Sequence, residues 1–417
     1  MKNKKFLSIV ILLVSISMII GCENSDLNNP LQKTQKVSSD LFSELEDTTK
    51  IDVYHNVYFE EDYKPSVISD KNIINDFLNY TLESVDNSKK ELSGNPVKSK
   101  MIFYDKNNNK KELKYVYDDL YEFGYVLNGE KRYDLPYDFF RLLAASEKYR
   151  SEHATVKQDV KNLFSKYKYK PSFMISSQFK KLPENLKYGY EENIEKIYWS
   201  YCMELSKAVG MDFLNLLSNE ISAEKYYLLE PLGKFAQEAN GIVIRHKGKI
   251  VGAYIQGNND GMVSTLDKKS FEKIKKMKID TWVCNNILDR QSKLYKESSN
   301  RSDLDLIKTY FEAMENKNYV NLLSTMDTKS IIDTLNCNIK NSELYQENIG
   351  ESLPRYANKI NILDIKKSEK DEKTYHVEMD ITTSDYATIE SGKNVRTVVI
   401  TEENGVKKIE IDVPGPQ

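Results

Sequence analysis

The residues after Ser302 change their hydrophobic period once, and this change limits the folds open to the last part of the chain. After Ser302, a residue type that caps helices, apolar residues recur at helical spacing. Two shorter helical runs follow at 319–326 and 329–335. Apolar and polar residues then alternate in four segments, 361–365, 375–381, 395–400 and 406–413. Asn404-Gly405 is a strong hairpin signal between the last two. The sequence predicts helices packed on a curved antiparallel sheet over 303–417. The stripe of the first helix is Leu304, Ile307, Tyr310, Phe311 and Met314.

This order of elements resembles the nuclear transport factor 2-like fold, whose sheet curls into a cone. The stretch Ile307-Lys-Thr-Tyr-Phe-Glu-Ala-Met-Glu-Asn-Lys-Asn-Tyr319 is similar to the first helix of an uncharacterised domain of that fold, found at the C-terminus of lipoproteins from low-GC Gram-positive bacteria. Segments 197–205 and 250–255 extend the resemblance to that lipoprotein family. The resemblance implies a cone in which Tyr310, Phe311 and Tyr375 are pocket or core residues. It implies no catalytic residue and no cofactor.

The N-terminal residues have the layout of a signal peptide. Residues 1–5 carry three lysines, and the run from Phe6 to Ile20 is uncharged. That run is shorter than the ~20 residues that a membrane-spanning helix needs. The segment Ile19-Ile20-Gly21-Cys22 resembles the lipobox of bacterial lipoproteins, which implies cleavage between Gly21 and Cys22 and a lipid on Cys22.

Two acyl chains anchor a protein stably, since each buried methylene contributes about 0.8 kcal/mol. We therefore expect a signal peptide at 1–21 and a lipid-anchored protein on the extracytoplasmic face of the cell membrane. Its partners during maturation would be a signal peptidase and lipid-transfer enzymes. Residues 22–50 are rich in Asn, Ser, Asp, Gln and Thr, which predicts a flexible tether.

Two further α+β modules are expected between the tether and residue 303. In the first, 51–150, a strand at 51–59 precedes a helix capped by Ser69-Asp70, and a meander with a hairpin turn at Asn128-Gly129 follows. Segments 102–109 and 125–133 resemble a small module of exported lipoproteins. In the second, 151–290, a helix at 191–209 precedes strand-like 226–229 and a hairpin formed by 241–245 and 249–255, and short helices end the module. Polar residues 291–302 are interpreted as a linker.

Composition narrows the classes of partner. The formal net charge of −3 becomes more negative once the signal lysines are removed, which argues against nucleic acid. One of the four cysteines is assigned to lipid, and the remaining three exclude a complete disulfide framework. Cys202 and Cys284 lie in predicted helices, where a cysteine is usually a buried small hydrophobe. A bridge between them is the less favoured alternative.

Metal and nucleophile motifs are missing from the sequence. The histidines His55, His153, His246 and His376 are far apart and lack metal-ligand spacing. Asp105 to Asn109 begins like a calcium loop, but Lys110 and Val116 replace the glycine and glutamate that such a loop needs. There is also no Gly-x-Ser-x-Gly motif. The run 166–170 alternates lysine and tyrosine, which fits a solvated strand or linker better than a grip on anionic polymer.

The cone invites comparison with isomerases, which need a carboxylate or histidine aimed into an apolar pocket. Along 375–381, the residues His376, Glu378 and Asp380 share the face opposite Tyr375, because strand side chains alternate. We therefore expect a protein that is not an enzyme and that binds a small-molecule or protein partner as a sensor or assembly factor. A small-molecule isomerase or hydrolase that uses the cone, and a structural spacer, are the alternatives.

Overall fold

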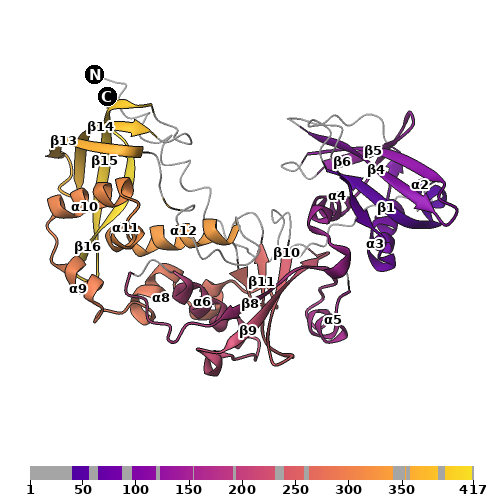
Figure 1. Cartoon of the computed structure of the whole chain (residues 1–417), viewed down its shortest axis with the longest axis horizontal. Coiled ribbons are helices and arrows are strands. Elements are labelled where there is room, and N and C mark those ends of the chain that lie inside the picture. Colours follow the sequence, from indigo (N-terminus) through magenta and orange to yellow (C-terminus); the bar gives the residue numbers. More distant parts are fainter. Residues whose placement is uncertain are drawn as a thin grey trace, which may run out of the picture. The chain divides into compact units, whose positions relative to one another are not determined.

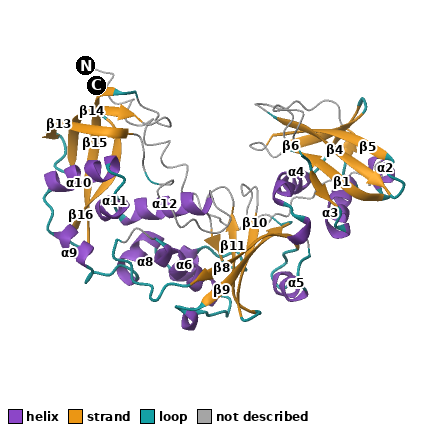
Figure 2. Ribbon diagram, in the orientation of Figure 1, coloured by secondary structure: helices purple, strands orange, loops and turns teal. Residues whose placement is uncertain are grey.

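Three antiparallel sheets and their helices make up the computed structural model, whose elements carry the labels of Figure 1. It describes residues 40–55, 64–86, 96–118, 123–153, 155–190, 194–230, 239–257, 263–340, 353, 357–383 and 390–415. Figure 2 separates its helices from its strands. The predicted α+β class with several small modules is confirmed. Among the described residues, no helix combines the length and apolar character needed to cross a membrane.

The first sheet has seven strands in the order β2-β1-β4-β5-β6-β7-β3. Asp70 caps α3 by accepting hydrogen bonds from two backbone amides of its first turn, as the sequence predicts. The apolar side of α3 packs in one core with α4 and the sheet. The strands are β1 (Thr48–Tyr54), β2 (Ser66–Ile68), β3 (Val85–Asp86), β4 (Val97–Asp105), β5 (Lys110–Asp118), β6 (Phe123–Asn128) and β7 (Lys131–Asp134). The helices are α2 (Asp40–Leu45), α3 (Lys71–Thr81) and α4 (Tyr137–Ala145).

The folded part begins earlier than the predicted tether allows. The predicted tether includes residues 40–50, yet α2 (Asp40–Leu45) and the start of β1 (Thr48–Tyr54) lie in this range. Leu41 and Leu45 of α2 are 0% and 1% exposed, and their burial against the first core holds this short helix in place. Three polar residues are thus enough, with Leu41, Phe42 and Leu45, to form a packed helix.

The second sheet has five strands in the order β12-β11-β10-β9-β8, and the cores on its two faces include residues of α6 and of α5 respectively. Ile242 and Tyr254 belong to the core on the α6 side, whereas Val243 and Tyr226 belong to the core that includes α5. Central strands β9 and β10 are therefore buried on both faces. The strands are β8 (Pro171–Lys181), β9 (Glu220–Leu228), β10 (Ala239–His246), β11 (Lys249–Gly257) and β12 (Val263–Ser264). The helices are α5 (Gln158–Ser165), α6 (Glu195–Lys207), α7 (Phe271–Lys275) and α8 (Ile279–Asn286).

Two predictions for this region differ from the structure. Strand β8 was not foreseen, and 166–170 forms the turn between α5 and β8, in which Lys168 has a φ of 63°. Tyr169 in this turn is 2% exposed and cannot stack on a polymer. The segment interpreted as a linker contains α9 (Lys293–Ser299), whose Tyr295 is buried. One hydrophobic core runs from Leu182 to Ile409, so the chain has no core boundary at 291–302.

The third sheet is a meander in the order β13-β14-β15-β16. Ser302 caps α10 through its hydroxyl, and Asn404-Gly405 forms the hairpin turn with φ values of 52° and 79°, as expected. The sequence places Leu304 on the buried stripe of α10, but Leu304 is 47% exposed and Leu306 is buried instead. The helices are α10 (Asp303–Glu315), α11 (Tyr319–Thr325) and α12 (Thr328–Lys340). The strands are β13 (Ala357–Lys367), β14 (Thr374–Thr383), β15 (Gly392–Glu403) and β16 (Val406–Pro414).

Candidate functional site

An open hollow of about 390 Å³ lies in the C-terminal module between α10, α12 and β16, and we call it the C-terminal hollow. Figure 1 shows α10 and α11 against the sheet that β16 completes. Helix α10 is amphipathic and turns Tyr310 toward β16, while β16 turns alternate residues toward the helices. The lining residues are Tyr310, Met326, Ser330, Asp333, Thr334, Cys337, Leu353, Ile409, Glu410 and Asp412.

A fixed carboxylate marks one wall of the C-terminal hollow. Arg396 of β15 donates from Nε to Oδ1 of Asp412 at 2.7 Å, and its Nη2 donates to the Asp412 carbonyl at 2.9 Å. The Tyr310 hydroxyl donates to Oδ2 of Asp412 at 3.1 Å. The side chains of Arg396 and Asp412 are each 7% exposed, so water screens this ion pair little. The carboxylate is therefore held in one orientation from two sides.

The other walls divide into an apolar floor and a polar rim. Met326, Leu353 and Ile409 are at most 6% exposed and form the apolar floor. The rim carries hydroxyls and two more carboxylates, of which Asp333 pairs with Lys329 at 3.0 Å within α12. Such a surface suits a ligand with an apolar body and a hydrogen-bond donor or positive charge.

The aromatic residues expected at the cone occupy three different environments. Tyr310 lines the C-terminal hollow. Phe311 is fully buried and meets the Tyr310 ring edge-on, with ring centroids 5.1 Å apart, so it is a core residue. The Tyr375 hydroxyl donates to Oδ2 of Asp303 at 2.6 Å, and burial together with this bond raises the pKa of Tyr375 to about 12. Tyr375 thus ties β14 to the start of α10.

The two faces of β14 separate as the sequence predicts. Tyr375, Val377, Met379 and Ile381 are buried, while the residues between them are partly or fully exposed. His376, Glu378 and Asp380 therefore lie on the side away from the core. Cys22 and Gly21, the other residues singled out in the sequence, lie outside the described residues.

The residue before Ile409 carries a buried charge. Lys408 is fully buried, and its Nζ donates to the Ser324 carbonyl at 2.6 Å and lies 3.6 Å from the centre of the Tyr190 ring. Burial lowers the pKa of Lys408 to about 7, with Glu403 opposing and Arg301 adding to this effect. Lys408 does not line the C-terminal hollow. We therefore expect its ionisation to affect the free energy of unfolding and not ligand binding in that hollow. Lys408, Arg396 and Asp412 were not identified in the sequence.

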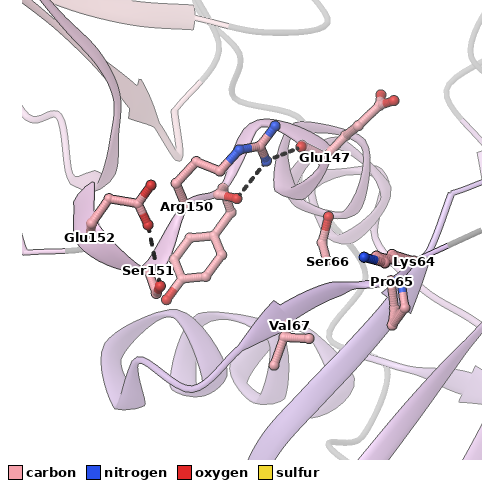
Figure 3. Close-up of a pocket in the computed structure, with 9 residues that line it drawn as sticks. Lys64, Pro65, Ser66, Val67, Glu147, Arg150, Ser151 and Glu152 are labelled. Carbon is pink, nitrogen blue, oxygen red and sulfur yellow. Dashed lines mark hydrogen bonds between the residues drawn. The ribbon is translucent and has the colours of Figure 1, made fainter.

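A second hollow of about 470 Å³ lies in the first module, as Figure 3 shows. Arg150 donates there to the backbone carbonyls of Glu147 and Tyr149 at 2.9 and 2.8 Å, and the Ser151 hydroxyl donates to Glu152. Lys64 lies on the opposite wall. The Arg150 guanidinium already donates hydrogen bonds to the backbone of its own turn. This hollow therefore has a less defined set of ligand-binding groups than the C-terminal hollow.

The described cysteines are all free thiols. Cys202 is fully buried, and burial raises its pKa to about 12, which makes the thiol inert. Cys284 is half-buried, and burial raises its pKa to about 11. Cys202 and Cys284 are therefore not bridged, in line with the favoured interpretation. Cys337 is exposed at the C-terminal hollow. Within the described part of the chain, no three His, Cys, Asp or Glu side chains gather as metal ligands would.

Two segments of the chain are similar to known domain families. Residues 163–255 match a family described as a domain of unknown function (DUF4830), and residues 305–409 match another described as a domain of unknown function (DUF4829). No curated protein and no solved structure matches the chain. The first match runs from the end of α5 to β11. The second contains Tyr310 and Arg396 and ends three residues before Asp412.

Proposed function

We propose that this chain is a lipoprotein, anchored by lipid on Cys22 at the extracytoplasmic face of the cell membrane, that binds a ligand without transforming it. The anchor is supported by the uncharged run before Gly21-Cys22. We also propose that the C-terminal module is nuclear transport factor 2-like, because three helices precede its four-stranded meander. The two domains of unknown function are consistent with an uncharacterised family, which we propose to be a lipoprotein family of low-GC Gram-positive bacteria.

The fixed carboxylate of Asp412 in the C-terminal hollow carries the binding proposal. A general base in an apolar pocket works best with a raised pKa and an oxygen free to take a proton. Both carboxylate oxygens of Asp412 instead accept hydrogen bonds, Oδ1 from Arg396 and Oδ2 from Tyr310. This arrangement suits recognition of a donor or cation better than proton transfer. The ligand we propose is a small amine or a basic side chain with an apolar body.

The exposed thiol of Cys337 gives a direct test of ligand binding. We would label the protein with a maleimide in the presence of short alkyl amines, with alkyl carboxylates of equal length as controls. Amines should slow the labelling of Cys337, because both would occupy the C-terminal hollow. Asp412→Asn should weaken this protection about tenfold or more, since hydrogen bonds to charged groups contribute roughly 1.5–3 kcal/mol. Asp364→Asn, which changes an exposed carboxylate on β13, is the matched control.

Equal protection by carboxylates, or equal loss in the two variants, would contradict a carboxylate-directed site. Turnover of a substrate that depends on Asp412 would instead support the isomerase or hydrolase alternative. A stable oligomer without any protection of Cys337 would support a structural spacer. Anchoring is tested separately: Cys22→Ser should release the protein from the membrane fraction and abolish its labelling by a radioactive fatty acid.

A further inference from the structure

The second half of β8 is exposed on both faces at the end of its sheet. None of the residues 177–181 is buried, whereas 171–173 are all buried. Strand β8 pairs with β9 and is the last strand in the order, so alternate residues of 177–181 direct their backbone groups away from the sheet. This half-strand offers a row of backbone donors and acceptors to a second extended segment.

A large apolar side chain lies on this half-strand. Phe179 is 74% exposed, more than any other large hydrophobic residue in the described part of the chain. It is paired with Ser222 of β9, which is paired with Arg245 of β10, so the three lie in one row on the α5 side of the sheet. Together they line an open hollow of about 570 Å³, which we call the β8 hollow. Helix α5 has only eight residues and leaves this end of the sheet uncovered.

The floor of the β8 hollow is an electrically balanced network around two buried residues, Arg245 and Glu224. Arg245 donates to Glu224 at 2.7 Å and to Asp159 at 2.6 Å, and Lys157 donates to Glu224 at 2.6 Å. Burial alone would raise the pKa of Glu224, but hydrogen bonds from Lys157, Arg245 and Tyr226 hold it below its ordinary value. The charges of the two cations and the two carboxylates therefore sum to zero, and the floor of the β8 hollow carries no net charge.

Positive charge predominates around this balanced floor. On the face that carries Phe179, the other charged residues of the β8 hollow and of 177–181 are Lys181, Lys247 and Glu220, while Lys180 points to the opposite face because side chains alternate along β8. This excess of positive charge would attract a negatively charged partner. Lysines on an edge strand also discourage pairing with a second copy, because the two copies would bring their lysines together.

We propose that residues 177–181 of β8 are a docking edge for an extended acidic peptide segment of a partner protein, with Phe179 as its apolar anchor. The partner backbone would pair with the free edge. On the Phe179 face of the sheet, its acidic side chains would lie near Lys181 and Lys247, and an apolar side chain would enter the β8 hollow beside Phe179. An anionic polymer without a peptide backbone could use the lysines but not the strand edge. This inference is independent of the C-terminal hollow.

The test uses a fluorescent peptide of repeating Val-Ser-Glu-Ser, which places valine and glutamate on one face of a strand, and a peptide of repeating Val-Ser-Lys-Ser as its charge control. Fluorescence anisotropy should show binding of the acidic peptide to the full chain and no comparable binding of the basic one. Phe179→Ser should weaken the affinity about tenfold, and Lys181→Glu should weaken it further in low salt. Val67→Ser is the matched control, because Val67 is 47% exposed on the edge strand of another sheet.

Hydrogen exchange distinguishes strand pairing from charge attraction alone. Bound acidic peptide should slow amide exchange within 177–181, because pairing engages those amides. Binding without such protection, or equal competition by a polyphosphate, would overturn the proposal. Failure of the acidic peptide to bind would also overturn it, as would self-association of the chain that Phe179→Ser abolishes. Circular dichroism of each variant verifies that its fold is retained.

Discussion

Lys408 places a charge where water cannot reach it, and this has a consequence for stability. Its pKa is about 7 in the folded protein, against 10.5 for an unburied lysine. Between these values the unfolded chain holds a proton that the folded protein lacks. Stability therefore rises as the pH increases from about 7 to about 10.5, and below pH 7 the full cost of burying the charge is present.

Replacing Lys408 by methionine should remove this pH dependence. The side chain keeps a similar length, and no group remains there to lose a proton. We expect Lys408→Met to be more stable than the parent protein near pH 7, and its Tm should vary less between pH 7 and 10. Lys407→Met is the control, because the Lys407 side chain is 45% exposed on the same strand. Parallel Tm profiles for the parent and Lys408→Met would contradict this account.

At the scale of the helix and strand, one close approach fixes α5 on its sheet. Gly241 of β10 lies directly beneath Phe164 of α5, and a Cβ on Gly241 would lie 2.2 Å from the Phe164 ring. The phenyl ring is fully buried, so it has little room to move aside. The glycine thus lets the helix pack against the strand beside the balanced network of Arg245.

The effect of Gly241→Ala should depend on the residue at position 164. We expect Gly241→Ala to destabilise the protein by roughly 1–3 kcal/mol, as overpacking of a core commonly does. In a Phe164→Leu background the added methyl group has more room, so the cost of Gly241→Ala should be smaller. Urea denaturation of the four proteins of this cycle measures the coupling. Additive free energies would show that the two residues do not press on each other.

Elements with strong local signals could be predicted from the sequence. Helix α3 has a capping aspartate and a regular apolar stripe, and the β15–β16 hairpin has Asn404-Gly405. Strand β8 lacks such a signal, because it starts at a proline and alternates only weakly. Helix α9 is short and polar, and only the burial of Tyr295 in a core shared with distant residues explains its place. The hydrophobic periodicity of a short segment does not reveal that residues far away in the sequence will bury it.

The candidate site was only partly predictable for the same reason. Tyr310 was found because it lies on the apolar stripe of α10. Arg396 shares a face of β15 with buried Val398 and Ile400. Its position two residues before Val398 is the sequence feature that indicates an inward-pointing side chain. Its partner Asp412 lies sixteen residues away, and only the pairing of β15 with β16 brings the two together.

For the whole molecule, the proposed roles fall to the C-terminal hollow and the β8 hollow, each in a region that matches a different domain family. The β8 hollow lies mostly within the DUF4830 match, while the C-terminal hollow lies mostly within the DUF4829 match. One core joins much of both regions, from Leu182 to Ile409. A protein with this organisation could hold a small ligand in one region and a partner segment in the other.

The most direct test of the binding proposal is a crystal structure of residues 23–417 purified from the native host, inspected at the C-terminal hollow. We predict density for a bound molecule whose donor or positive charge faces Asp412 and whose apolar part lies on Met326 and Ile409. The proposal would be contradicted if the chain's own side chains closed the C-terminal hollow. It would also be contradicted by a bound molecule that places no donor near Asp412.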